Sequence, residues 1–228
     1  LAGKPVADIR IDGAGKKVTR SDNCRVSDLS VSSDNLTFTY EAKSLPYPID
    51  TSYYDNEKHT QADALSVIPF MDEMNYEGLS VSGLSDGYYG LTIGGEFIGR
   101  FTARELERGI NMALLQNTPQ YKQAMKIRQM NEERWLKERK MREFYWVEYN
   151  LMRKTGMLWA CNEAAVDTLR KYRPHDIFLQ WNGDLWLQYM HKGIREDCVN
   201  EQQDLVNQIY EQNKPIPLRI EIKKFTDL

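Results

Sequence analysis

Along residues 79–120 the apolar positions change their spacing from every second residue to every third or fourth. Over residues 79–93 they alternate with small or polar residues around a polar turn at 85–87, which is typical of half-buried β-strands. Gly94 and Gly95 then predict a second turn. This stretch is therefore expected to be a β-hairpin that leads into a helix, with the rest of the chain organised around it.

The start of that helix is indicated by Thr102 and Glu105, whose three-residue spacing matches a reciprocal capping box. A helix is therefore predicted from Ala103. Four apolar residues at helical spacing would form its buried face. They are Leu106, Ile110, Ala113 and Leu114.

Strand-like patterns also occur at both ends of the chain. Residues 6–11, 26–31 and 36–40 are rich in β-branched and aromatic residues, and polar or glycine-containing turns separate them. They predict a small antiparallel sheet. Residues 218–223 alternate between apolar and charged side chains, so we expect this segment to be a strand that returns to the first sheet.

Between these strands the spacing is helical. Thr118 and Pro119 predict a helix start, and no strong break follows until about residue 155. Residues 126–143 carry both signs of charge, which indicates a solvated, ion-paired helix. Residues 144–152 hold too many apolar side chains for one stripe, so we expect that end to be buried on more than one side.

Two further helices are predicted. Asn162 is placed to cap the first of them, and Pro174 is expected to end it. The second is predicted over residues 184–213, after an aromatic, turn-bearing connection at 175–183.

This order of strands, helices and a final strand predicts an α+β fold: a small antiparallel sheet and hairpin region, then a bundle of long helices, then a strand that returns to the sheet. We expect a β-rich region at residues 1–101, a helical region at 102–213 and a C-terminal strand region at 214–228. The last is predicted to pack on the β-rich region as one body.

The composition narrows the possible partners. Thirty basic and thirty-three acidic residues give a net charge near −3, which does not favour nucleic acid. The sequence contains no apolar run of about eighteen residues, so no membrane span is predicted. The chain begins with Leu1 and not with methionine, which suggests a processed or truncated product.

The cysteines do not suggest a disulfide framework or a zinc site. Cys24, Cys161 and Cys198 are few and far apart. We expect three reduced, buried thiols, although one bridge and one free thiol stay open as an alternative. No metal, cofactor or catalytic residue is assigned, because His59, His175 and His191 have no second ligand type at metal spacing.

The candidates for ligand contact are aromatic. Trp159, Trp181 and Trp186 offer faces on which a sugar ring could stack, although buried packing is the more common role of such residues. A polar loop over residues 50–60 offers further side chains that could face a ligand, or could simply be a solvated excursion. These are Tyr53, Tyr54, Asp55 and His59.

A series of apolar, glycine and helix-capping positions begins at Leu79. Its members are Leu79, Val81, Gly83, Leu84, Gly87, Tyr89, Leu91, Ile93, Gly95, Thr102, Glu105, Leu106, Gly109, Ile110, Asn111, Ala113, Thr118 and Pro119. In order and spacing this series resembles the region that follows the catalytic domain in bacterial SGNH (GDSL-type) esterases. The resemblance extends over about residues 25–155, and Leu45, Pro46, Met74 and Asn75 also fit it.

The catalytic blocks of that family are missing. Gly183-Asp184 is followed by leucine and not by serine, and Asp55 and His59 have the wrong spacing for the late acid and base. The resemblance therefore implies a non-catalytic C-terminal region of a secreted or periplasmic esterase, acting on acylated carbohydrate, that packs against an upstream SGNH catalytic domain or shapes its cleft. The alternative is a stand-alone module that binds a glycan or a protein.

Overall fold

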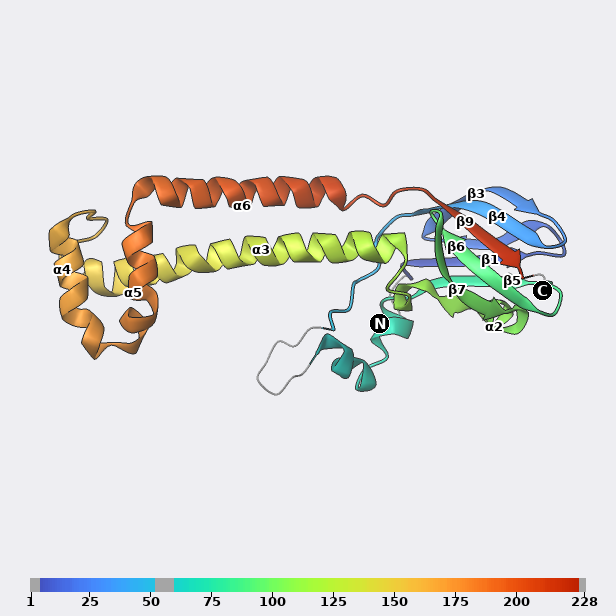
Figure 1. Cartoon of the computed structure of the whole chain (residues 1–228), viewed down its shortest axis with the longest axis horizontal. Coiled ribbons are helices and arrows are strands. Elements are labelled where there is room, and N and C mark those ends of the chain that lie inside the picture. The colour runs from blue at the N-terminus through green and yellow to red at the C-terminus, as the bar shows by residue number, and fades with distance from the viewer. Residues whose placement is uncertain (1–4, 52–59, 226–228) are drawn as a thin grey trace. The chain divides into compact units, whose positions relative to one another are not determined.

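The computed structural model describes residues 5–51 and 60–225, and the chain divides into two units (Figure 1). The β unit contains the residues up to Arg128 together with those from Gln212 onward, and the helical unit is Gln129–Glu211. Antiparallel sheets, a long-helix region and a returning C-terminal strand confirm the predicted α+β class. The loop candidates Tyr53, Tyr54, Asp55 and His59 lie outside the described residues.

The first sheet of the β unit has four strands in the order β2-β1-β5-β8. Their bounds are Ala7–Asp12 for β1, Lys17–Asp22 for β2, Glu77–Ser82 for β5 and Ile110–Asn111 for β8. β1 pairs with β5 in parallel, and the other neighbours are antiparallel.

The second sheet is antiparallel, with the order β3-β4-β9-β6-β7. Its strands are β3 (Cys24–Val31), β4 (Asn35–Ala42), β6 (Tyr88–Ile93), β7 (Glu96–Thr102) and β9 (Leu218–Lys224). The last strand lies in the middle, between β4 and β6 (Figure 1), where Ile220 pairs with Phe38 on one side and with Ile93 on the other. The predicted return of the C-terminal strand is confirmed, because β9 pairs with β4, one of the strands expected in the N-terminal sheet. That expected single sheet is wrong, since β1 lies in the first sheet while β3 and β4 lie in the second.

Apolar residues from both sheets form one core, because alternate side chains of each strand point to the same face. Ile9, Val81, Phe38, Leu91 and Ile222 are each at most 1% exposed. Burial of such side chains stabilises the fold by roughly 1.5–3 kcal/mol each.

Two other parts of the strand prediction are also wrong. Residues 79–93 do not form one hairpin: β5 pairs with β1, and the hairpin is formed by β6 and β7 around Gly94 and Gly95, both of which have positive φ. The strand β2 was not predicted. It is an edge strand whose single apolar side chain, Val18, gives no alternating pattern.

The helix predicted from Ala103 is α2, and it ends at Arg108. Its capping box is present, since the Glu105 amide donates to Thr102 Oγ1 at 3.2 Å and the Thr102 amide donates to Glu105 Oε2 at 2.7 Å. The predicted continuation to Leu114 is wrong. Gly109 follows with φ of 95°, a conformation that favours glycine, and Ile110 then enters β8.

The β unit also contains short helical pieces. A 3-10 turn spans Gln61–Ser66, α1 spans Phe70–Glu73, and a second 3-10 turn spans Met112–Leu114.

The helical unit begins within α3 (Pro119–Val147), which continues as a π-helical turn at Glu148–Met152. After it come α4 (Glu163–Tyr172), a 3-10 turn at Arg173–His175, α5 (Ile177–Tyr189) and α6 (Lys192–Gln212). Figure 1 shows α6 running beside α3, and two contacts agree with this. Lys137 Nζ lies 2.5 Å from Glu201 Oε2, and Cys198 Sγ lies 3.7 Å from the Lys137 carbonyl.

The predicted starts of α3 at Pro119 and of α4 after Asn162 are confirmed. The predicted connection at residues 175–183 is wrong, because Asp176 caps α5 by accepting hydrogen bonds from the amides of Phe178 and Leu179 at 2.8 and 3.2 Å. The predicted single helix over 184–213 is two helices, with the break at Met190 and His191.

A candidate ligand pocket in the helical unit

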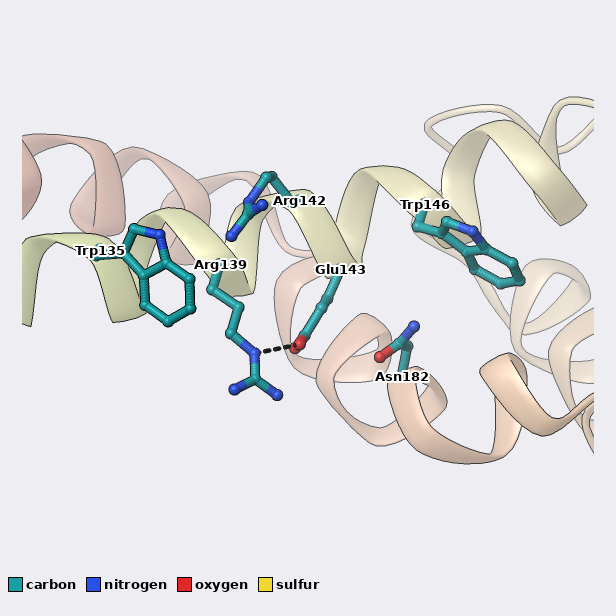
Figure 2. Close-up of a pocket in the computed structure, with 6 residues that line it drawn as sticks. All are labelled: Trp135, Arg139, Arg142, Glu143, Trp146 and Asn182. Atoms are coloured by element: carbon teal, nitrogen blue, oxygen red, sulfur yellow. Dashed lines mark hydrogen bonds and ion pairs between the residues drawn. The ribbon is translucent and has the colours of Figure 1, made fainter. Parts of the chain in front are cut away.

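One face of α3 carries two tryptophans, two arginines and a glutamate at helical spacing. Trp135, Arg139, Glu143 and Trp146 lie three or four residues apart, so their side chains project from the same side of the helix, and Arg142 follows Arg139 at a spacing of three. Together with Asn182 of α5 they line a hollow of about 370 Å³ (Figure 2). This volume lies in the range of small-molecule pockets, about 300–1,000 Å³.

The charges in this pocket are partly paired. Arg139 Nε lies 2.7 Å from Glu143 Oε1, as Figure 2 shows, and Arg142 Nε lies 3.8 Å from Glu138 Oε1. The Arg142 guanidinium also lies 5.6 Å from the centre of the Trp135 ring, within the range of a cation–π contact. Two guanidinium groups and one carboxylate line the pocket, so its lining has an excess of positive charge.

The aromatic surface extends beyond the pocket through α5. The ring centres of Trp146 and Phe178 are 5.2 Å apart, and those of Phe178 and Trp181 are 5.5 Å apart. Phe178 and Trp181 are 49% and 67% exposed, so part of this aromatic surface is open to solvent. With the adjacent guanidinium groups, it suits a planar, apolar molecule that carries a hydrogen-bond acceptor or a negative charge.

The three tryptophans named from the sequence lie in different surroundings. Trp186 is fully buried and donates from Nε1 to Glu148 Oε1 at 2.8 Å, which leaves no face of its ring open. Trp159 is 45% exposed and contacts Tyr145 and Tyr149. Trp181 contacts Phe178, so Trp159 and Trp181 remain predicted ligand contacts, at separate places.

The backbone at Trp159 is unusual. Its φ is 63°, a left-handed conformation that is rare for a bulky residue, and its amide donates to Glu148 Oε2 at 2.8 Å. The buried carboxylate of Glu148 therefore fixes both the Trp159 backbone and the Trp186 ring.

A cysteine and a histidine of the helical unit lie in contact. Cys161 Sγ lies 3.4 Å from His191 Nδ1, and Cys161 is exposed, which corrects the expectation of three buried thiols. The thiols of Cys24 and Cys198 are free and buried. Over residues 5–51 and 60–225 no serine hydroxyl is hydrogen-bonded to a histidine, so this part of the chain assembles no serine–histidine pair.

Within the same residues, no cluster of three or more histidine, cysteine, aspartate or glutamate side chains is arranged to hold a metal ion. No helix in the described part of the chain combines the length and the hydropathy that crossing a membrane requires.

Comparison with known proteins gives two matches. A family model described as the diltiazem deacetylase C-terminal helical domain matches residues 125–214, a range that contains the whole helical unit. The solved structure of BT4096, described as a gut microbial diltiazem-metabolizing enzyme, is similar with a TM-score of 0.91 and 36% identity over 98% of this chain. This chain spans 51% of the length of that enzyme. No curated protein matches.

These findings overturn the resemblance to SGNH-type esterases. Both matches are to diltiazem-metabolizing proteins, and neither is to the C-terminal region of an SGNH or GDSL esterase. They support the coarser expectation, since the matched region is a C-terminal helical domain related to a hydrolase.

Proposed function

We propose that this chain is the non-catalytic C-terminal half of an acyl-ester hydrolase of the deacetylase type, and that the remaining part of that protein supplies the catalytic residues. The main support is structural similarity: 98% of this chain matches 51% of the length of a diltiazem-metabolizing enzyme. The match of residues 125–214 to the helical domain of a deacetylase points to the same reaction class.

The chemistry of the described residues is consistent with a supporting role. An ester hydrolase of this type needs an activated nucleophile, and the described serines have no histidine partner. The aromatic and cationic pocket of Figure 2 can hold part of a substrate without attacking it. Its partner is then the catalytic region, and its contribution is to shape the approach of the ester.

The test compares this chain alone with the longer protein that contains it, using 4-nitrophenyl acetate and an acetylated sugar as substrates. We expect the chain alone to hydrolyse neither ester above background and the longer protein to hydrolyse at least one. Cys161→Ser in the longer protein should leave that rate unchanged, because the thiol contacting His191 takes no part in the reaction. Which ester is hydrolysed also decides between aryl and carbohydrate substrates.

Two results would overturn the proposal. One is turnover by the chain alone that disappears on Cys161→Ser or His191→Ala, since catalysis would then lie within this chain. The other is a longer protein that hydrolyses no acyl ester.

A further inference from the structure

A second hollow in the helical unit shares Trp146 with the pocket of Figure 2. It has a volume of about 360 Å³ and lies between the C-terminal end of α3 and the turn that joins α4 to α5. Its lining combines apolar, aromatic and polar side chains. They are Trp146, Asn150, Leu151, Lys154, Thr155, Tyr172, His175, Asp176 and Leu179.

The apolar part of this hollow is well defined. Leu151 and Leu179 are 6% and 3% exposed and belong to the core of the helical unit, so they form a fixed apolar base. The rings of Trp146 and Tyr172 complete the apolar lining. Such a combination of apolar base and aromatic sides suits one or two fused rings.

A π-helical turn lies next to this hollow. Residues 148–152 adopt it directly after α3, and two lining residues, Asn150 and Leu151, belong to it. π-helical turns are rare and are frequently found at functional sites. The turn is fixed from the core side, because buried Glu148 accepts hydrogen bonds from the Trp159 amide and from Trp186 Nε1.

The charged groups of the lining are not equally available. The side chains of Lys154 and His175 make no hydrogen bond or ion pair with any other described residue. The carboxylate of Asp176, by contrast, accepts two backbone amides at the start of α5. The groups left free for a ligand are therefore an ammonium and an imidazole.

The neighbouring charges do not cancel this preference. Lys171 lies 5.5 Å from the centre of the Tyr172 ring and adds positive charge beside the hollow. The nearby carboxylate of Asp184 is bound by both terminal nitrogens of Arg173, at 2.6 and 2.7 Å. A negative group is thus favoured over a positive one.

From these contacts we infer that this hollow binds a small aromatic carboxylate. Its ring lies on the leucine base beside Trp146 and Tyr172, and its carboxylate accepts hydrogen bonds from the Lys154 ammonium and the His175 ring. This binding requires no catalytic residue, so it does not depend on the ester hydrolase proposed above.

The test is isothermal titration calorimetry of the full chain with 2-naphthoate, and with 2-naphthalenemethanol as the neutral probe of matched shape. We expect the acid to bind more tightly than the alcohol. Lys154→Met should lower the affinity for the acid about tenfold, which is the effect of losing a hydrogen bond to a charged group. The affinity for the alcohol should not change. Because Lys154 is exposed, the variant is expected to fold, and far-UV circular dichroism verifies this.

Two matched controls locate the acid. Lys192→Met removes an exposed lysine of α6 that pairs with Glu196 and should not change acid binding. Arg142→Gln removes a charge from the pocket of Figure 2 and reports whether the acid binds in that pocket instead. The inference fails if Lys154→Met binds the acid as the wild type does, or if Arg142→Gln alone weakens it. It also fails if the alcohol binds as tightly as the acid, or if the wild type binds no acid at millimolar concentration.

Discussion

The carboxyl group of Glu77, in the first position of β5, provides a sharp test of the β unit. It is fully buried and accepts hydrogen bonds from the Tyr40 hydroxyl at 2.8 Å and from Gln120 Nε2 at 3.2 Å. Burial raises the pKa of Glu77 to about 7, although the two hydrogen bonds act in the opposite direction. The folded state therefore holds this proton more tightly than the unfolded state does.

The stability that Glu77 contributes decreases as the pH rises. At a pH between the ordinary pKa of 4.5 and the folded value of about 7, the folded protein keeps a proton that the unfolded chain releases. Glu77 therefore contributes its full stability below about pH 4.5, and this contribution is lost as the pH rises through about 7. Each pH unit is worth about 1.36 kcal/mol, so the loss is roughly 3 kcal/mol.

Glu77→Gln is expected to remove this loss. The new amide keeps an oxygen that accepts from Tyr40, and it adds a donor. Gln120 Oε1 is buried without a partner in the wild type. If the Gln120 amide rotates, Gln120 Oε1 can accept a hydrogen bond from the new side-chain amide at position 77. The variant should match the wild type at pH 5 and exceed its free energy of unfolding at pH 8 by up to about 3 kcal/mol.

The assay is urea unfolding at pH 5 and pH 8, followed by far-UV circular dichroism. All five tryptophans lie in the helical unit, so tryptophan fluorescence follows that unit, and hydrogen exchange of the β4 and β9 amides reports on the β unit. The exposed Glu107 of α2 supplies the control Glu107→Gln, which should keep the pH dependence of the wild type.

Asp28 and Glu105 give the opposite pH dependence of stability. Hydrogen bonds lower the pKa values of Asp28 and Glu105, so their contributions are present at neutral pH and are lost only as the pH falls into the acid range. The reasoning about Glu77 is refuted if the wild type and Glu77→Gln lose the same free energy of unfolding between pH 5 and pH 8.

Three further predictions concern the Glu148 carboxylate and two glycines. Glu148→Ala leaves the part-buried Trp159 amide and the buried Trp186 Nε1 without an acceptor, so it should destabilise the helical unit by about 2–4 kcal/mol. An unchanged urea midpoint by tryptophan fluorescence would contradict this. Gly109→Ala forces a side chain into φ of 95° and should cost about 1–3 kcal/mol. Gly193→Ala in α6, where no atom lies within 4 Å of the added Cβ, should instead raise the free energy of unfolding by about 0.5 kcal/mol. The melting temperature should therefore fall for Gly109→Ala and rise for Gly193→Ala. If both melting temperatures shift in the same direction, backbone conformation does not decide the effect of these substitutions.

Much of the fold could be predicted because local signals and burial agree. β9 alternates cleanly, and the caps at Thr102 and Asn162 hold as expected. The errors arise where tertiary structure overrides local pattern. Ile110 has helical spacing from Leu106, but the conformation of Gly109 turns the chain into β8. The local sequence also does not show which strands pair with each other, so it places β5 in the wrong hairpin.

The candidate pocket could not be predicted from the same signals. The charges around Trp135 and Trp146 indicated only a solvated helix, and Asn182 lay in a segment expected to be a connection. The α3 spacing of two tryptophans and two arginines was the available signal. The burial of Trp186 could not be predicted either. Its ring nitrogen donates to Glu148, 38 residues earlier in the chain, and the sequence around Trp186 gives no sign of that partner.

Gln123 joins the two segments of the β unit between which the helical unit is inserted. Its Nε2 donates to the carbonyls of Gln212 and Lys214 at 2.8 and 2.9 Å, so the first turns of α3 are held to the end of α6. The segment that follows then enters the middle of a sheet as β9, with a partner strand on each side. The helical unit is therefore an insertion between β-strands whose pairing does not involve it. Substitutions on the exposed face of α3 within the helical unit should therefore leave these strand pairings unchanged.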